Sequence, residues 1–405
     1  MRAAAQRQFQ LGISAVRAHH LARAHQPQQQ RRSLIQYPAR LFFPAAILHG
    51  ALFIPLSVWA MRGGLAGQLA FGPGHGGEML AGYALAVIAG FLLPQLPRPR
   101  LLALFALWLL GRAAVVAGLA GPWLVLPNVA FALCIAVLIV PRFMTAAKKL
   151  RNMATGPLVG CIALAISAAS VLLALAAPPA VNMLYLAVTL LAGLMLFMGA
   201  RVLVPALSGA YSRRGERLLI RVQPRLEGAM LLCLIAAAFG LLAPVLHPLA
   251  GAGAIATGVV SWLRLLRWRI WRRLDSADLW GLGLGYAWVA SGMLMLGVEL
   301  LWQWPLRVAG LHAITVGGLG TLSLNIMGRT WLFRQGVAPN RVWALVWASG
   351  LVSAATLCRI LAIMGSRFAL NWLAAACWSL AFVVVLAGLW LPIWLRRLRA
   401  AGAAG

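Results

Sequence analysis

A histidine and a glutamate, His75 and Glu78, stand in the stretch GHGGEM, immediately before a long apolar run. A neutral imidazole is the commonest protein ligand for transition metals, and it binds haem iron as well. A carboxylate one helical turn away can orient such a ring or balance the charge of a metal. The pair therefore predicts a metal or haem ligand with a supporting acid. The alternative for each histidine is a hydrogen-bonded packing role.

Two more histidines lie in apolar segments. His312 begins the run HAITVGGLGTLSLNIMGRT, and His49 lies inside the first long apolar run of the chain. A polar side chain inside a membrane is costly, so each marks a candidate functional position. The small residues that follow Glu78 and His312 let helix backbones approach closely. We therefore expect both of these histidine-bearing segments to pack deep inside a helical bundle.

The composition places these residues in a lipid bilayer. The chain has 405 residues, of which 62% are hydrophobic and only 10% are charged, whereas average proteins carry about 25% charged residues. A helix needs about 20 mainly apolar residues to cross a membrane, and about twelve such runs follow one another here. They cover residues 41–61, 78–97, 101–120, 123–140, 157–177, 182–200, 226–244, 249–264, 278–302, 310–332, 342–364 and 369–395. Because the runs are apolar on every face rather than alternating, they predict an all-α, polytopic integral membrane protein.

Basic residues gather in every second loop. The chain has 35 lysines and arginines against 6 acids, a formal net charge of +29. The loops after the second, fourth, sixth, eighth and tenth runs are basic, as are both ends of the chain. By the positive-inside rule, these loops and both termini are cytoplasmic. A nucleic-acid-binding protein would gather its basic residues on one soluble face, so nucleic acid is not expected as a partner.

The apolar runs leave no room for a separate soluble domain. We expect a basic, unstructured cytoplasmic tail over residues 1–38, a single transmembrane helical domain over 39–398 and a short cytoplasmic tail over 399–405. The five cysteines are widely spaced inside apolar runs and form no CxxC motif. We expect them to pack between helices rather than to bind a metal.

The predicted topology gathers rare polar residues at one depth. Those near the outer face are His75, Glu78, Glu299, Arg307, His312 and Arg359. We expect His75 and His312 to lie close together across the second and tenth spans. Glu299 is expected to pair with one of the two outer arginines at the interface. Arg112 and Arg329 are expected to reach backbone carbonyls or the membrane surface.

Several stretches resemble the NnrS family of bacterial membrane proteins, and the likeness extends over most of the chain from residue 39 onward. Members of that family carry a WHAHEM-type motif before a transmembrane helix, which GHGGEMLAGYALAVIAGFLL matches here. Further similar stretches are ARLFF at 39–43, LWLLGR at 107–112, GARVLVP at 199–205, LRLLRWRIWRRLDSADLWGLGLGYAW at 263–288 and HAITVGGLGTLSLNIMGRT at 312–330.

The resemblance implies an inner-membrane protein that carries haem and copper and responds to nitric oxide and nitrosative stress, often in denitrifying bacteria. It places the first motif histidine on His75, the motif glutamate on Glu78 and the histidine of the tenth helix on His312. The family's second motif histidine corresponds to Gly77. Either one metal ligand is therefore missing from this chain, or another group such as His49 takes its place.

Two other classes of membrane protein share features with this sequence. A bundle of about twelve helices with internal arginines is also a common format for a transporter without a metal cofactor, although the two halves show no evident repeat. A haem-copper oxidase or nitric oxide reductase needs enough helix-borne histidines for two haems and a second metal. The apolar runs contain too few histidines for that class.

Overall fold

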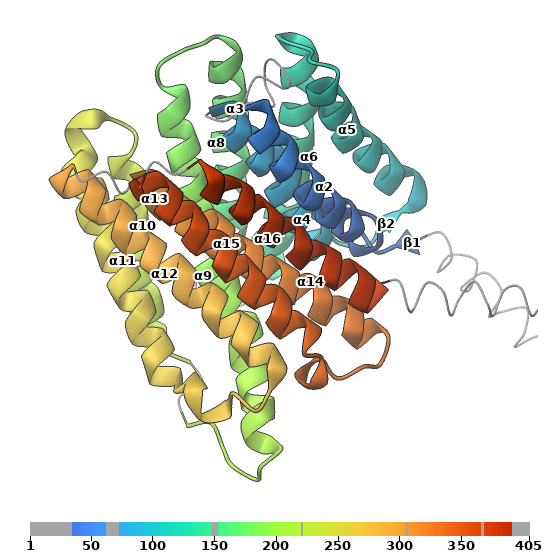
Figure 1. The fold of residues 1–405 in the computed structure, drawn as a ribbon, viewed down its shortest axis with the longest axis vertical. Helices are drawn as coiled ribbons and strands as arrows, with labels where there is room; N and C mark the ends of the chain where they lie inside the picture. Colours follow the sequence, from blue (N-terminus) through green and yellow to red (C-terminus); the bar gives the residue numbers. More distant parts are fainter. Residues whose placement is uncertain are drawn as a thin grey trace, which may run out of the picture.

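The computed structural model describes residues 35–61, 73–146, 153–219, 222–303, 307–365 and 368–390. Within these residues the chain forms a bundle of long helices that lie side by side (Figure 1). Eleven of them are long and apolar enough to cross a membrane. One more, α10 (Pro224–Gly240), has 17 residues and is the seventh in chain order. The prediction of an all-α polytopic membrane protein with about twelve spans is confirmed.

The helices follow the apolar runs closely. The first span is α2 (Ala39–Ala60), and the second consists of α3 (Pro73–Glu78), η1 (Met79–Ala84) and α4 (Leu85–Leu92). The third to ninth spans are α5 (Arg98–Val116), α6 (Pro122–Ala146), α8 (Thr155–Ala174), α9 (Ala180–Ser212), α10, α11 (His247–Trp268) and α12 (Ala277–Trp302). The tenth consists of α13 (Arg307–His312), η4 (Ala313–Gly320) and α14 (Thr321–Arg334), the eleventh is α15 (Ala344–Gly365), and the twelfth is α16 (Ala369–Val385) with η6 (Leu386–Trp390). Short 3-10 turns are η2 (Pro244–Leu246), η3 (Ile270–Arg273) and η5 (Pro339–Arg341), and β1 (Ile35–Gln36) pairs antiparallel with β2 (Leu96–Pro97).

The largest departure from the expected limits is in α9, which continues to Ser212 although its apolar run ends at residue 200. Its last three turns keep one apolar side buried, with Leu203, Leu207 and Tyr211 inside the molecule. This side meets η3, which follows α11. Tertiary packing thus extends the helix beyond the part that hydropathy identifies.

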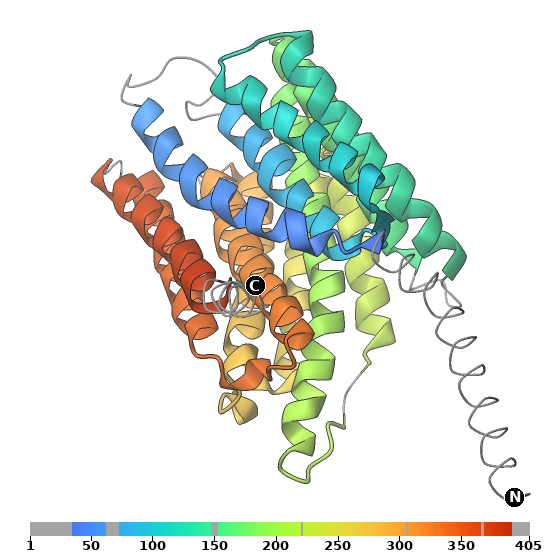
Figure 2. The ribbon, with the colours of Figure 1, turned by 90° about the vertical axis from the view of Figure 1, so that its right-hand side faces the viewer.

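Two contacts join distant parts of the sequence. Near the end of the chain, α16 packs on α2, and the indole of Trp378 donates a hydrogen bond of 2.8 Å to the carbonyl of Gly50. The two helices run beside each other in both Figure 1 and Figure 2. The second span also meets the tenth, where the hydroxyls of Tyr83 and Ser323 lie 2.5 Å apart. The helices that carry His49, His75 and His312 are therefore parts of one packed unit.

The second and tenth spans are the most buried of the eleven membrane-crossing helices among the described residues. In each of the two spans, 72% of an apolar stretch of 18 residues is buried inside the molecule, compared with 28% of the corresponding stretch in α6. Small residues permit this burial. A Cβ atom at Gly318 would stand 2.4 Å from the side chain of Val289, and one at Gly90 equally close to Phe43. The expectation that both spans pack deep inside the bundle is confirmed.

Both buried spans change their winding directly after a functional candidate. The π-helical segment η1 begins one residue after Glu78, and the π-helical segment η4 begins one residue after His312. A π-helical turn inside an α-helix is rare and is frequent at functional sites. Its wider winding changes the direction in which the following side chains point. The structure therefore marks the same two places that the polar residues mark in the sequence.

Candidate functional site

A cavity of about 380 Å³ lies between the second, sixth, tenth, eleventh and twelfth spans, with α2 at its side. His75 and His312 both line it, so the two histidines that were expected to lie near each other share one cavity. The remaining polar part includes Arg359 on α15 and Asn371 on α16. Most of the other lining side chains are apolar, among them Ile54, Leu80, Leu184 and Trp378. The cavity is thus an apolar space with two imidazoles and a polar corner.

His312 is held in one orientation by its own helix. Its Nδ1 donates a hydrogen bond of 2.7 Å to the carbonyl oxygen of Val308, one turn earlier. Because a carbonyl oxygen can only accept, the proton of a neutral ring is on Nδ1. The lone pair is then on Nε2, the opposite ring nitrogen. This is the arrangement in which metal-ligating histidines are commonly fixed.

His75 is held by the neighbouring helix α2. Its Nδ1 lies 3.0 Å from the hydroxyl oxygen of Ser57, which is fully buried. Its ring also stacks on Phe53, with ring centroids 5.8 Å apart and an angle of 16° between the planes. Two contacts on one ring restrict its rotation. In both cavity histidines, Nδ1 is therefore engaged by an orienting partner.

Arg359 and Asn371 form the polar corner of the cavity. A guanidinium nitrogen of Arg359 donates to the amide oxygen of Asn371 over 2.5 Å. The two residues come from neighbouring helices, so the bond ties α15 to α16 while both side chains line the cavity. A guanidinium group next to an apolar cavity attracts an anionic group such as a carboxylate.

Glu78 belongs to a second polar cluster beside the cavity. Its carboxylate lies 2.6 Å from Nε of Arg112 on α5 and 3.5 Å from Nε2 of His49 on α2. Arg112 also donates to the side-chain oxygen of Asn128 on α6. The side chains of Glu78, Arg112 and His49 are 5%, 9% and 11% exposed. Neither Glu78 nor His49 is among the described residues that line the cavity.

Gly82 makes room for this cluster. A Cβ atom at this position would stand 2.6 Å from Nε2 of His49, 2.9 Å from Nη1 of Arg112 and 3.0 Å from Oε1 of Glu78. The indole of Trp108 donates to the Gly82 carbonyl over 2.9 Å. Three ionisable groups thus meet over the bare backbone of η1. Phe53 connects the cluster to the cavity, because it stacks on His49 as well as on His75.

The expectations for the two inner arginines were wrong. Arg112 pairs with the carboxylate of Glu78, and Arg329 pairs with the carboxylate of Asp278. From the sequence, both arginine side chains were expected to reach backbone carbonyls or the membrane surface. A buried carboxylate is the better partner because each charge then offsets the desolvation of the other. Glu299 is buried and has a partner, while the side chain of Arg307 lies outside the described residues.

Position 77 does not face the cavity. A Cβ atom at Gly77 would stand 3.2 Å from Leu173 on α8, and Gly77 is not among the described residues that line the cavity, whereas Gly76 is. A histidine at position 77 would therefore point toward α8. In this chain the difference from the family motif leaves the pair formed by His75 and His312 unchanged.

Two polar residues that contact cavity side chains were not predicted from the sequence. Asn371 lines the cavity and Ser57 contacts the lining residue His75, and both are polar residues inside long apolar runs. The rule that polar residues within spans mark function would have included both. Their roles as partners of His75 and Arg359 depend on helices that are distant in sequence, so only the fold reveals them.

Among the described residues, no three side chains of His, Cys, Asp or Glu lie together in a way that could hold a metal ion. The cavity instead offers two imidazoles within an apolar space. Such a donor set fits a cofactor that brings its own remaining ligands, as a haem does.

Comparison with known families identifies the chain. A family model described as NnrS protein matches residues 33–397, which is nearly the whole sequence. A search of curated proteins finds no match. The matched region contains every described helix, both candidate histidines and the cluster around Glu78. The chain is therefore a multi-pass membrane protein that belongs to the NnrS family.

Proposed function

We propose that this protein binds haem in the cavity between the second and tenth spans and serves in the response to nitric oxide and nitrosative stress. The observation that carries the proposal is that His75 and His312, from different spans, line one apolar cavity with Nδ1 of each ring engaged by an orienting partner. Membership of the NnrS family supports it, because that family is generally associated with haem and copper.

The residues present fit a haem. Ligand cavities usually measure about 300–1,000 Å³ and have mainly apolar walls with a few placed polar groups, and this cavity of about 380 Å³ has that character. His75 and His312 would hold the iron through Nε2. The guanidinium of Arg359 and the amide of Asn371 supply hydrogen-bond donors for the carboxylates at the edge of a porphyrin.

Each part of the cavity has a separate task in this proposal. A bound haem would supply an iron for a small diatomic ligand, which would have to replace one of the two histidines, because the porphyrin and two imidazoles already provide six nitrogen ligands. Ser57 and the carbonyl of Val308 keep the two imidazoles turned toward the cavity. The apolar walls exclude water, while nitric oxide, which is small and uncharged, passes through lipid and reaches the cavity.

The residues around His49 do not fit a copper ion. His49 Nε2 and Glu78 are two donors, and Arg112 lies 2.6 Å from the same carboxylate. A guanidinium at that distance repels a second cation and already occupies the carboxylate. We therefore assign no copper ligand in this cluster, and copper, where it is bound, requires donors other than this pair.

The arrangement in the cell is part of the proposal. We infer that the protein resides in the bacterial inner membrane, with the basic loops and both termini in the cytoplasm, because basic loops alternate with loops poor in lysine and arginine. The cavity with His75 and His312 would then open toward the outer side. The proposed domain, residues 39–398, contains all of the described helices.

The test is the visible spectrum of the detergent-purified protein, with haem quantified after extraction. We expect a Soret band that shifts on addition of nitric oxide. His75→Ala and His312→Ala should each lower the haem content at least tenfold while thermal stability changes little, because each removes a ligand without opening a large void. His247→Ala is the matched control. His247 begins α11 and is not among the described residues that line the cavity, so its replacement should leave the spectrum unchanged.

Two results would contradict the proposal. The first is a pair of folded alanine variants that retain full haem content, which would reduce the histidines to packing residues. The second is a folded wild-type protein that has no colour and takes up no added haemin, which would favour the transporter instead.

A further inference from the structure

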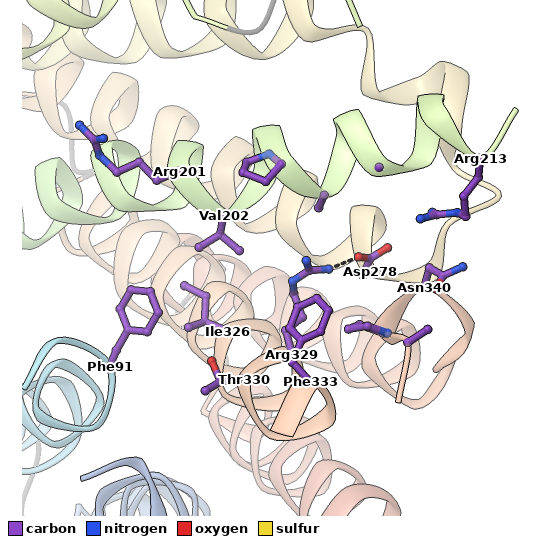
Figure 3. A pocket seen from close by; sticks show the side chains of 15 residues that line it. Phe91, Arg201, Val202, Arg213, Asp278, Ile326, Arg329, Thr330, Phe333 and Asn340 are labelled. Carbon is purple, nitrogen blue, oxygen red and sulfur yellow. Dashed lines mark hydrogen bonds and ion pairs between the residues drawn. The ribbon is translucent and has the colours of Figure 1, made fainter. Parts of the chain in front are cut away.

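A second cavity, of about 470 Å³ (Figure 3), has lining residues at the opposite end of the second, sixth and tenth spans. Its walls come from the last turns of the second, sixth and tenth spans, the first turn of α12 and the segment around η5. This is the end of the bundle that carries the basic loops. The cavity therefore lies at the boundary between the membrane and the basic side.

Guanidinium groups dominate the polar wall. Arg201, Arg213 and Arg329 line the cavity together with the acid Asp278. Both oxygens of Asp278 already have a partner, because Oδ2 pairs with Arg329 and Oδ1 accepts from Ser276. The same hydroxyl of Ser276 accepts a hydrogen bond of 2.7 Å from Arg213. Arg329 therefore contacts the carboxylate directly, as Figure 3 shows, and Arg213 is linked to it through the hydroxyl of Ser276.

The neighbouring acid does not cancel the remaining charge. Glu227 lies 3.6 Å from Arg201 and also 3.6 Å from Arg264, so it is shared between two cations. Together, Asp278 and Glu227 face four arginines: Arg201, Arg213, Arg264 and Arg329. Among the described residues of this region, the arginines therefore exceed the acids by two, and this positive excess favours an anion.

The other wall of the cavity is apolar. Phe91, Val202 and Ile326 lie between Arg201 and Arg329 in Figure 3, and Phe333, which is 61% exposed, lies against the guanidinium of Arg329. The exposed ring indicates that the cavity reaches the surface of the bundle. A ligand that fits both walls has an anionic head and an apolar part beside it.

We propose that this cavity binds a phosphate ester, with the phosphate at Arg213 and Arg329. Arginine matches phosphate because its planar group donates two parallel hydrogen bonds. The apolar wall and the position at the membrane boundary make an anionic phospholipid the expected source, and basic pockets between helices on the cytoplasmic side commonly take such headgroups. A soluble phosphate ester shares the same chemistry and is the other source.

The experiment compares two adjacent arginines in the full-length protein. Arg213→Gln removes a cavity guanidinium that is exposed, so folding should be preserved. Arg214→Gln is the matched control, because Arg214 pairs with Asp275 over 3.1 Å and is not among the described residues lining the cavity. Phosphatidylglycerol retained by the purified protein is measured by native mass spectrometry. Its affinity is measured by titration into detergent micelles, with phosphatidylcholine and inorganic phosphate as separate titrants.

We expect phosphatidylglycerol to bind, and Arg213→Gln to weaken it about fivefold or more while Arg214→Gln does not. Binding of phosphatidylglycerol that inorganic phosphate does not displace assigns the site to a lipid. Saturable binding of inorganic phosphate with the same dependence on Arg213 assigns it to a soluble ester. Equal effects of the two substitutions, or no preference for phosphatidylglycerol over phosphatidylcholine together with no phosphate binding, would overturn the proposal.

Discussion

Glu78 illustrates what burial demands of a charged side chain. Its carboxylate is 5% exposed and lies against Arg112 and His49, with Asn128 satisfying a further nitrogen of the arginine. The desolvation of such groups is offset only while every partner is present. The cluster at the start of the second span therefore stabilises the fold only while all of its polar partners are present. At the residue scale this separates Glu78, which maintains charge balance, from His75, which faces the cavity.

Removing the carboxylate alone should destabilise the protein. Glu78→Gln leaves the guanidinium of Arg112 buried without its counter-charge, which costs about 3–5 kcal/mol. The melting temperature in detergent should fall clearly, and the double variant Glu78→Gln with Arg112→Met should recover most of the loss. Asp275→Asn is the control, because the side chains of Asp275 and Arg214, which form an ion pair, are 45% and 53% exposed. Such surface pairs contribute about 0–1 kcal/mol to the free energy of unfolding.

A different outcome would move Glu78 to another role. If Glu78→Gln kept its melting temperature but lost haem absorbance per folded protein, the glutamate would act on His75, as the sequence suggested, rather than on the stability of the cluster.

At the element scale, the tenth span depends on close backbone contact with α12. A Cβ atom at Gly292 would stand 2.8 Å from the backbone nitrogen of Ile314 and 2.9 Å from the carbonyl oxygen of Gly310. Separations below 3.0 Å between such atoms essentially do not occur. Gly292 thereby sets the distance of the segment that contains His312 and the start of η4. Neighbouring backbone cannot rotate away as a side chain can.

Gly292→Ala should displace the start of the tenth span. We expect a loss of about 1–3 kcal/mol, the usual cost of overpacking, and a lower haem content because His312 moves with its helix. Gly350→Ala is the control on α15, where no atom lies within 4 Å of the added carbon. That substitution should be neutral or stabilise by up to about 1 kcal/mol. Equal stability and haem content of the two variants would show that the helices α12 and the tenth span can move apart without loss of stability.

At the scale of the whole molecule, the two cavities share three spans and occupy opposite ends of them. The second, sixth and tenth spans line one cavity near their starts and the other near their ends. The first cavity has an apolar character with two imidazoles, and the second has a wall of arginines. This polarity follows the alternation of basic loops along the chain. The proposed haem site and the proposed phosphate site therefore face opposite sides of the membrane.

Reporter fusions test this orientation. Alkaline phosphatase fused after Ala177, in the loop between α8 and α9, should be active, because that loop lacks lysine and arginine and is expected outside. Alkaline phosphatase fused after Arg399 should be inactive, while a fluorescent protein fused there should be bright. Activity of the phosphatase after Arg399 would reverse the topology and place His75 and His312 on the cytoplasmic side.

The sequence by itself determined the class of the molecule and the places where chemistry is concentrated. The spans could be predicted because a bilayer selects each of them separately, by the length and hydropathy of a continuous run of residues. The alternation of basic loops is equally local. His75 and His312 could be singled out because polar groups in such runs are few, and the cost of burying them is a property of the residue.

Only the tertiary structure decided which polar groups meet. Tyr83 contacts Ser323 across 240 positions of sequence, and Asp278 contacts Arg329 across 51. Helix packing sets these pairs through the shapes of whole apolar faces, which a single run does not reveal. The carboxylate of Glu78 therefore pairs with Arg112, a partner that neither residue's own segment specifies. The two cavities arise for the same reason, since each is the space that five or more elements leave between them after they have packed.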